Sequence, residues 1–107
     1  MLSYSEPKEV DKIRSYISEL FDYYEGDTIR IKSWDLNKIL FNGRLSTKRV
    51  RELLTDYLSV KQDSKKRRYI MPVLERLDNF VNGEAVYKIY SLKCNGKPHV
   101  FYRKDFS

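Results

Sequence analysis

Residues 46–58, STKRVRELLTDYL, carry the clearest periodic pattern in the chain and decide its predicted fold. Ser46 is well suited to cap a helix, because its hydroxyl can accept a hydrogen bond from an amide of the first turn. Apolar residues then recur at the spacing of one helical face: Val50, Leu53, Leu54, Tyr57 and Leu58. The opposite side is polar and basic, so the stretch predicts a helix that packs on a core along one side only.

The residues just before this helix predict a short helix and a tight turn. Ser33 is expected to cap the short helix. Its inward residues should be Leu36, Ile39 and Leu40. Asn42-Gly43 should end it, since both residues accept the left-handed conformation that often follows a helix. Residues 28–32 alternate apolar and basic side chains, which predicts a short half-buried strand.

The first segment predicts a helix over residues 7–25. Pro7 suits the first turn, where its missing N–H would be unpaired in any residue. One apolar stripe follows at spacings of three and four: Val10, Ile13, Ile17, Leu20, Phe21 and Tyr24. Gly26 is expected to end the helix as a left-handed C-cap.

The C-terminal part predicts a loop, an additional helix and a hairpin. Residues 61–68 are polar and charged, as expected of a loop. Pro72 can open a helix over 72–81, which Asn82-Gly83 would end. Residues 85–92 and 99–106 are rich in strand formers and flank the segment 94–97. That segment contains Asn-Gly, a strong signal for a tight hairpin turn, with Pro98 at an edge or in the loop.

Composition limits the classes of function. The 107 residues suit one domain, and they include one cysteine (Cys94) and one histidine (His99). A disulfide framework and a cysteine-cluster metal site are therefore excluded. We expect no catalytic residues, no metal and no cofactor, because nucleophile, base and phosphate-loop motifs are missing and Cys94 and His99 look like ordinary hairpin-loop residues. No signal peptide or membrane span is apparent, which predicts a cytoplasmic protein, nucleoid-associated if prokaryotic.

Charge is distributed unevenly along the chain. The net charge is +6, yet residues 1–27 hold three Lys/Arg against seven Asp/Glu. Residues 28–68 hold twelve Lys/Arg against four Asp/Glu, and they surround the clearest helix. An acidic segment on a basic body is the pattern expected when one face meets a polyanion.

The order of elements resembles the winged helix-turn-helix superfamily of DNA-binding regulators. The resemblance rests on the short helix with LNKIL (36–40), the turn after it, and STKRVRELL (46–54). It implies an α+β domain over 1–107 with a three-helix core, here with an additional helix and a C-terminal β-hairpin. Residues 61–83, which include the additional helix, depart from the commonest form, in which the recognition helix leads almost directly into the wing.

We therefore expect a sequence-preferring protein that binds double-stranded DNA, such as a transcriptional regulator or an accessory factor. A recognition helix presents its N-terminal half to base edges, and basic loops hold phosphates. The expected DNA-binding residues are Arg44, Thr47, Lys48, Arg51, Lys65, Lys66, Arg67, Arg68, Lys93 and Lys97. Any surface helix also shows charge opposite its core face, and the run 65–68 can equally be a solvated loop or a targeting signal.

Other functions remain open at this point. The winged helix can serve as a protein–protein interaction module within a replication or transcription complex, since fold alone does not settle function. Aromatic residues of the hairpin could stack unpaired bases, although cross-strand packing is their more common role. A homodimer through residues 7–25 is also expected, because this segment has more aromatic surface than a small core needs. The residues behind that expectation are Tyr16, Phe21, Tyr23 and Tyr24.

Overall fold

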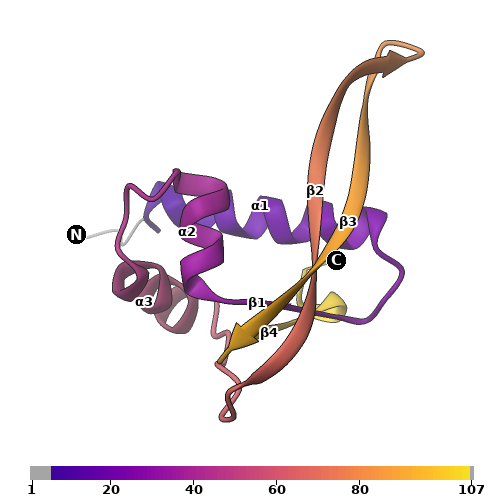
Figure 1. Cartoon of the computed structure of the whole chain (residues 1–107). Helices are drawn as coiled ribbons and strands as arrows, with labels where there is room; N and C mark the ends of the chain where they lie inside the picture. The colour runs from indigo at the N-terminus through magenta and orange to yellow at the C-terminus, as the bar shows by residue number, and fades with distance from the viewer. Residues whose placement is uncertain (1–5, 107) are drawn as a thin grey trace, which may run out of the picture.

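The computed structural model describes residues 6–106 and shows an α+β architecture (Figure 1). The elements in chain order are α1 (Lys8–Tyr23), β1 (Thr28–Ile31), α2 (Ser33–Phe41), α3 (Thr47–Tyr57), β2 (Arg67–Val81), β3 (Glu84–Gly96), β4 (His99–Tyr102) and a 3₁₀ turn, η1 (Arg103–Asp105). The three predicted helices in the first half and the strand before α2 are therefore confirmed.

The core forms where the three helices meet the inward face of β1 and β4. The buried stripe of α1 follows the predicted spacing, and α3 buries three apolar residues of its predicted face. Tyr57 departs from the expectation, because it lies largely exposed at the end of α3. Ile29, Ile31 and Phe101 close the core from the strands, and none of them is more than 1% exposed.

The end of α1 differs from the predicted glycine cap. Tyr24 is the C-cap and is extended, whereas Gly26 is not left-handed. Arg103 satisfies carbonyls at this end by donating to Phe21 O and Gly26 O, each at 2.7 Å, and to Tyr24 O. A cation is favoured there, because the C-terminus of a helix carries partial negative charge. A Cβ at position 26 would lie 2.3 Å from the far end of the Tyr24 ring, so that ring would have to shift for any larger residue.

The start of α2 also differs from expectation. Lys32 is the N-cap and makes no side-chain cap bond, so the predicted cap at Ser33 is wrong. Ser33 is buried instead, with its Oγ 3.3 Å from Nδ1 of His99. Ile39 was expected to point inward but is exposed. The predicted end of the helix is confirmed, because Asn42 and Gly43 are left-handed with φ of 53° and 77°.

Residues 72–81 form a strand, so the predicted additional helix is wrong. β2 runs through this segment and pairs antiparallel with β3. Its first half alternates as a strand does, with Tyr69, Met71 and Val73 buried and Ile70 exposed. Pro72 is tolerated because the two-stranded ribbon has free edges, where a missing N–H breaks no ladder bond.

The hairpin turn lies at Asn82-Gly83 instead of the predicted Asn95-Gly96. Both turn residues have positive φ, 54° and 82°, as a type I′ turn requires. Asn95 and Gly96 lie within β3 opposite Arg68 and Arg67. The predicted hairpin between 85–92 and 99–106 is therefore wrong, since 85–92 pairs within the ribbon and β4 pairs with β1.

The β1–β4 pair and the β2–β3 ribbon meet near Gly96. Thr28 to Ile31 pair with Tyr102 to His99. Along the other side of β4, Val100 donates to Lys61 O at 3.1 Å and Asp63 donates to Pro98 O at 2.7 Å. The ribbon then runs past α1 and projects beyond the helices to a free tip (Figure 1). Tyr69, near the start of β2, fixes this end of the ribbon to α2 by donating to Asp35 Oδ2 at 3.3 Å.

The aromatic surface of α1 is mostly used within the chain. Tyr16 and Phe21 belong to the core. Tyr23 is about half exposed, and its ring centroid lies 5.5 Å from that of Tyr87 on the ribbon. The apolar surplus that suggested a homodimer through 7–25 is therefore small, and that expectation stays a prediction.

Candidate nucleic-acid interface

The first part of the candidate interface is α3, whose orientation is fixed at its start. Ser46 is the N-cap, and its Oγ accepts the Arg49 N–H at 3.0 Å, as predicted. Val50, Leu53 and Leu54 are fully buried. Because one side of α3 is held in the core, the opposite side must face solvent.

The turn before α3 is held by a buried side chain that the sequence analysis did not single out. Asn37 donates from Nδ2 to Leu45 O at 2.6 Å and accepts the Leu45 N–H at 3.1 Å. Its own carbonyl accepts the Gly43 N–H at 3.0 Å. These bonds close the connection between α2 and α3 and so set the angle at which α3 is presented. At about 100° per residue, Asn37 lies next to Leu40 at the border of the predicted apolar face, and a polar residue at that position was the available signal.

Acidic side chains are confined to one sector of the solvent side of α3. At about 100° per residue, Lys48, Arg51 and Thr55 fall within one sector of the solvent side. Arg49, Glu52 and Asp56 fall on the other flank, where Arg49 and Glu52 form an ion pair at 3.7 Å. We call Lys48, Arg51 and Thr55 the free face of α3. Thr47, at the start of the helix, is half-buried beside it.

The charge of Arg51 acts on β4: burial first, and then this charge, lower the pKa of His99. Thr55 uses its hydroxyl locally, because Oγ1 donates to Arg51 O at 3.0 Å. Within residues 6–106, Lys48 and Arg51 are therefore the side chains of the free face whose donors make no hydrogen bond or ion pair and can bind a ligand.

The second part of the candidate interface lies where β2 begins and β3 ends. Arg67 pairs with Gly96, Arg68 with Asn95 and Ile70 with Lys93. Six predicted residues gather here, and we call them the ribbon base: Lys65, Lys66, Arg67, Arg68, Lys93 and Lys97. All six are exposed. Lys32, the N-cap of α2, joins them, because its Nζ donates to Asn95 O at 3.0 Å.

Arg67 differs from its neighbours because it is paired in the free protein. It forms an ion pair with Asp63, whose side chain is only 11% exposed. The Lys65 N–H, and then Arg67, hold the pKa of the Asp63 carboxyl below its usual value. Asp63 thus anchors the loop that carries the lysines, and Lys65 and Lys66 extend freely from it.

The free face of α3 and the ribbon base are connected by a short, bonded segment. Residues 60–63 follow α3 directly and pair along β4. Gln62 adds a bond from Nε2 to Lys97 O at 2.9 Å. The two parts therefore keep a fixed relation to each other through backbone and side-chain bonds.

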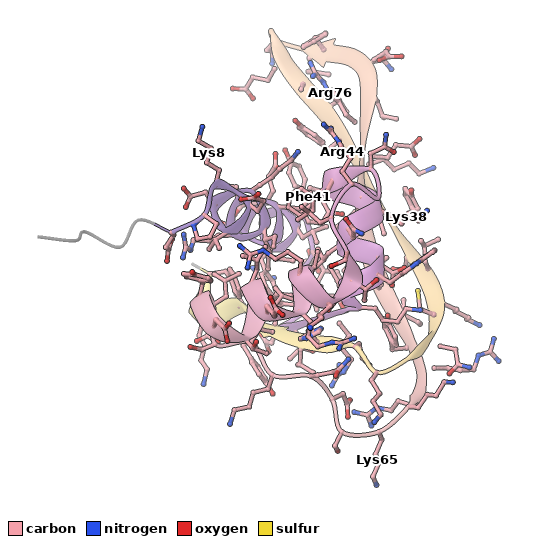
Figure 2. The ribbon with its side chains drawn as sticks, turned by 90° about the vertical axis from the view of Figure 1, so that its left-hand side faces the viewer. Lys8, Lys38, Phe41, Arg44, Lys65 and Arg76 are labelled. Carbon is pink, nitrogen blue, oxygen red and sulfur yellow. The ribbon has the colours of Figure 1, made fainter. Side chains whose placement is uncertain are left out.

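Arg44 lies apart from the ribbon base. Figure 2 shows Arg44 near the end of α2 that carries Phe41, whereas Lys65 is at the bottom of the view. Arg44 is exposed, and its Nε donates to Phe41 O at 3.3 Å. The structure therefore brings six of the ten predicted residues together at the ribbon base, places Thr47, Lys48 and Arg51 on α3, and leaves Arg44 in the turn before it.

Trp34 is an exposed aromatic residue that the sequence analysis missed. It is 52% exposed on α2. Lys32 Nζ and Lys38 Nζ lie 5.7 and 5.2 Å from its ring centroid. Its position outside the apolar stripe of the predicted short helix was the signal for an exposed side chain.

Cys94 and His99 are not the hairpin-loop residues that were expected. Cys94 lies in β3, half-buried, and burial raises the pKa of its thiol. His99 is fully buried in β4. Residues 6–106 bring together no group of three histidine, cysteine or acidic side chains suited to a metal ion. In the same part of the chain, no helix is long and apolar enough to cross a membrane.

Comparison with known proteins gives no relative. No family model matches the chain, and no curated protein or solved structure is significantly similar to it.

Proposed function

We propose that this chain is a winged helix-turn-helix protein that binds duplex DNA, with α3 in the major groove and the ribbon base on the phosphates. The observation that carries the proposal is the fixed pairing of the free face of α3 with the ribbon base through residues 60–63. The order helix, strand, helix, helix and hairpin supports it, and so does the pairing of β1 with the last strand. Without the additional helix, α3 is followed directly by β-structure, as in the commonest winged-helix form.

In this proposal α3 selects the base sequence. Lys48 and Arg51 lie in its N-terminal half, the part of a recognition helix that meets base edges. Arginine and lysine suit the O6 and N7 acceptors of guanine, and Thr47 beside them can contact a base or a phosphate. Arg44, in the turn before α3, would contact the backbone next to the groove.

The ribbon base supplies affinity that depends little on sequence. Its six cations extend from two strands and two loops that share one end of the ribbon. Each phosphate they neutralise releases about one counterion, which makes binding depend on salt. These contacts would position α3 on the duplex, because phosphate contacts fix register and orientation.

The test of sequence reading compares two arginines of α3. A preferred duplex is first selected from a randomised library with the intact protein. Arg51→Ala should weaken binding to that duplex by about 1–3 kcal/mol and weaken binding to an unrelated duplex less, because a base contact is lost. Arg49→Ala is the matched control, since it removes the same charge from the other flank of α3. Equal losses for the two variants on both duplexes would contradict the recognition-helix assignment.

The test of phosphate contact removes two charges from the ribbon base. Lys66→Gln with Arg67→Gln should flatten the slope of log K against log salt by about 1.8 and weaken every duplex alike, about 60-fold at 0.1 M salt. Arg76→Gln with Lys88→Gln is the control pair, because both residues are exposed on the ribbon between its base and its tip. If the control pair flattened the slope as much, the effect would reflect net charge and not the ribbon base.

One observation favours a second candidate, a protein–protein interaction module. Phe80 and Val81 end β2 at the ribbon tip and are 59% and 60% exposed, and Figure 1 shows that this tip projects away from the helices. A module of this kind would bind duplexes weakly and without sequence preference. Its response to Arg51→Ala would then match its response to Arg49→Ala.

A further inference from the structure

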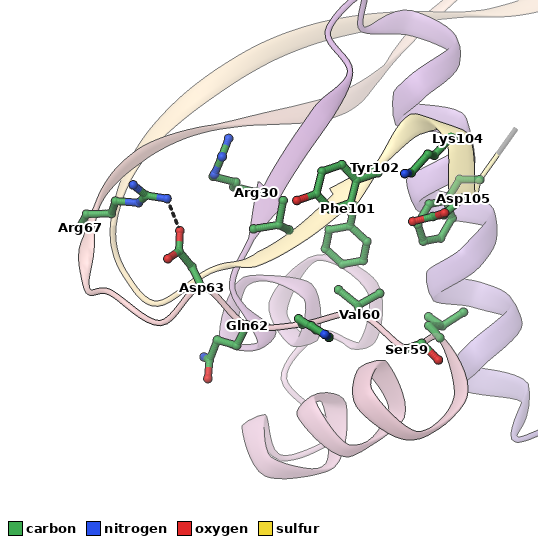
Figure 3. A pocket seen from close by; sticks show the side chains of 14 residues that line it. Arg30, Ser59, Val60, Gln62, Asp63, Arg67, Phe101, Tyr102, Lys104 and Asp105 are labelled. Atoms are coloured by element: carbon green, nitrogen blue, oxygen red, sulfur yellow. Dashed lines mark hydrogen bonds and ion pairs between the residues drawn. The ribbon is translucent and has the colours of Figure 1, made fainter.

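A pocket of about 560 Å³ lies along the β1–β4 pair and is lined partly by core residues and partly by the face of the pair that points away from the core (Figure 3). It is bounded by β1, the segment 58–63, β4 and η1, with Arg67 at one end. Its size falls in the range of small-molecule sites in proteins. No residue of α3 lines the pocket, although Leu58, directly after the helix, does.

Strand alternation brings one arginine and one tyrosine to this outer face. Ile29 and Ile31 point into the core, so Arg30 between them points outward. On β4 the buried residues are His99 and Phe101, which turns Tyr102 outward. Tyr102 pairs with Thr28, two residues before Arg30, and such diagonal neighbours are within reach of long side chains.

Arg30 is half-buried and has unused hydrogen-bond donors. Among the residues that the structure describes, its one side-chain hydrogen bond is a long contact of 3.4 Å from Nη1 to Thr28 Oγ1. Within residues 6–106 its guanidinium forms no ion pair, although Asp63, which pairs with Arg67, is near enough for the charge of Arg30 to help lower the pKa of its carboxyl. A guanidinium with free N–H donors is suited to bidentate hydrogen bonding with a carboxylate or phosphate.

The rest of the lining carries charges of both signs. Lys61 and Lys104 add two ammonium groups, and Asp63 and Asp105 add two carboxylates. Among the apolar lining residues, Val60 and Phe101 belong to the core and are at most 6% exposed, Phe106 is half-buried, and the Tyr102 ring is about half exposed. Lys104 Nζ lies 5.8 Å from the centroid of that ring. An exposed aromatic ring next to cations favours a ligand that is flat at one end and anionic at the other.

We infer that this pocket binds a nucleotide, with its phosphate on the Arg30 guanidinium and its base against the Tyr102 ring. The nucleotide can be a free mononucleotide or one unit of a nucleic-acid strand, because both offer the same phosphate and base. The site lies apart from the free face of α3, so its existence does not depend on duplex binding by that face.

The experiment is a titration of the isotopically labelled protein with AMP, followed by amide chemical shifts. Millimolar AMP should shift the amides of residues 28–31, 60–63 and 99–104. Arg30→Gln should weaken AMP binding about tenfold or more, since a hydrogen bond to a charged group contributes on that order. Tyr102→Leu should weaken the binding of AMP but not that of inorganic phosphate.

Lys93→Gln is the matched control for charge, because it removes one exposed cation from the ribbon base and leaves the pocket intact. Its AMP affinity should equal that of the unsubstituted protein. Equal weakening by Arg30→Gln and Lys93→Gln, or shifts confined to the ribbon base, would overturn the inference. A short phosphorylated single strand that shifts the same amides when AMP does not would keep the site and assign the nucleotide to a strand.

The inference and the proposed function can fail separately. Arg30→Gln should leave binding of the selected duplex within about twofold, because Arg30 is not among its proposed contacts. Loss of AMP binding with intact duplex binding confirms two sites. Absence of any AMP shift in a protein that still binds its duplex overturns the pocket alone.

Discussion

Replacing Leu54 by alanine is expected to lower the free energy of unfolding by about 2–5 kcal/mol. Leu54 lies on α3 with none of its surface exposed, among buried residues of α1 and the strands. The substitution removes three carbon atoms and leaves a cavity that rigid neighbours fill only in part. A loss of this size is a large share of the stability of a domain with 107 residues.

Denaturant titration followed by circular dichroism measures this loss. Tyr57→Ala is the matched control, because Tyr57 is on the same helix but 43% exposed, and it should cost clearly less. Similar midpoints for Leu54→Ala and the unsubstituted protein would mean that α3 is not held in the core. The presentation of its free face would then lose its physical basis.

The second large effect is a loss of stability in mild acid caused by His99. Burial, and then the charge of Arg51, lower the pKa of His99 from its ordinary 6.5 to about 4. Unfolded chains take up a proton at this residue below pH 6.5, whereas the folded protein does so only near pH 4. Stability from the neutral imidazole is therefore complete above pH 6.5 and falls between pH 6.5 and 4, by about 3 kcal/mol in total.

The environment of His99 explains why protonation is unfavourable. Nδ1 lies 3.3 Å from Ser33 Oγ, and Nε2 is buried without a hydrogen-bond partner among residues 6–106. A second proton would place an uncompensated charge there. His99→Leu should flatten the stability profile between pH 6.5 and 4, measured as unfolding free energy at several pH values. An unchanged slope in the leucine variant would assign the acid sensitivity to carboxyl groups.

The first half of the fold could be predicted because its signals are local and agree with one another. The buried stripes of α1 and α3 repeat every three to four residues, and the cap at Ser46 is where its hydroxyl predicts it. The left-handed residues at Asn42-Gly43 also end α2 as expected. Each of these features depends on residues within about one or two helical turns.

The second half was mispredicted because two local signals are ambiguous. Asn-Gly occurs at 42–43, 82–83 and 95–96, and the same dipeptide ends a helix, turns a hairpin and lies within a strand. In β2, a register shift between Leu77 and Phe80 breaks the two-residue period. Its apolar residues are spaced as on a helix, so local spacing predicted a helix where the chain forms an irregular strand.

The candidate interface was predictable in part for the same reason. The free face of α3 follows from helical spacing, and Lys65 to Arg68 form one run in the sequence. Lys93 and Lys97 were assigned to DNA binding because a hairpin was predicted between residues 85–92 and 99–106, and the structure does not form that hairpin. Long-range pairing of β3 with β2 still brings them to the same end as Arg67 and Arg68. Lys32 reaches that end only through the meeting of β1 with Gly96, which local sequence cannot show.

The hydrogen bonds from Arg103 to the end of α1, and the pairing of β1 with β4, have a consequence for the order of folding. Both join residues near 20–31 to residues 99–103, and closing so long a loop costs entropy before any contact repays it. The α2–α3 pair and the β2–β3 ribbon involve near neighbours and should form sooner. During synthesis on a ribosome, Ile29 and Ile31 could not complete their core contacts until Phe101 had been made. The core would therefore close only after nearly all of residues 6–106 had been synthesised.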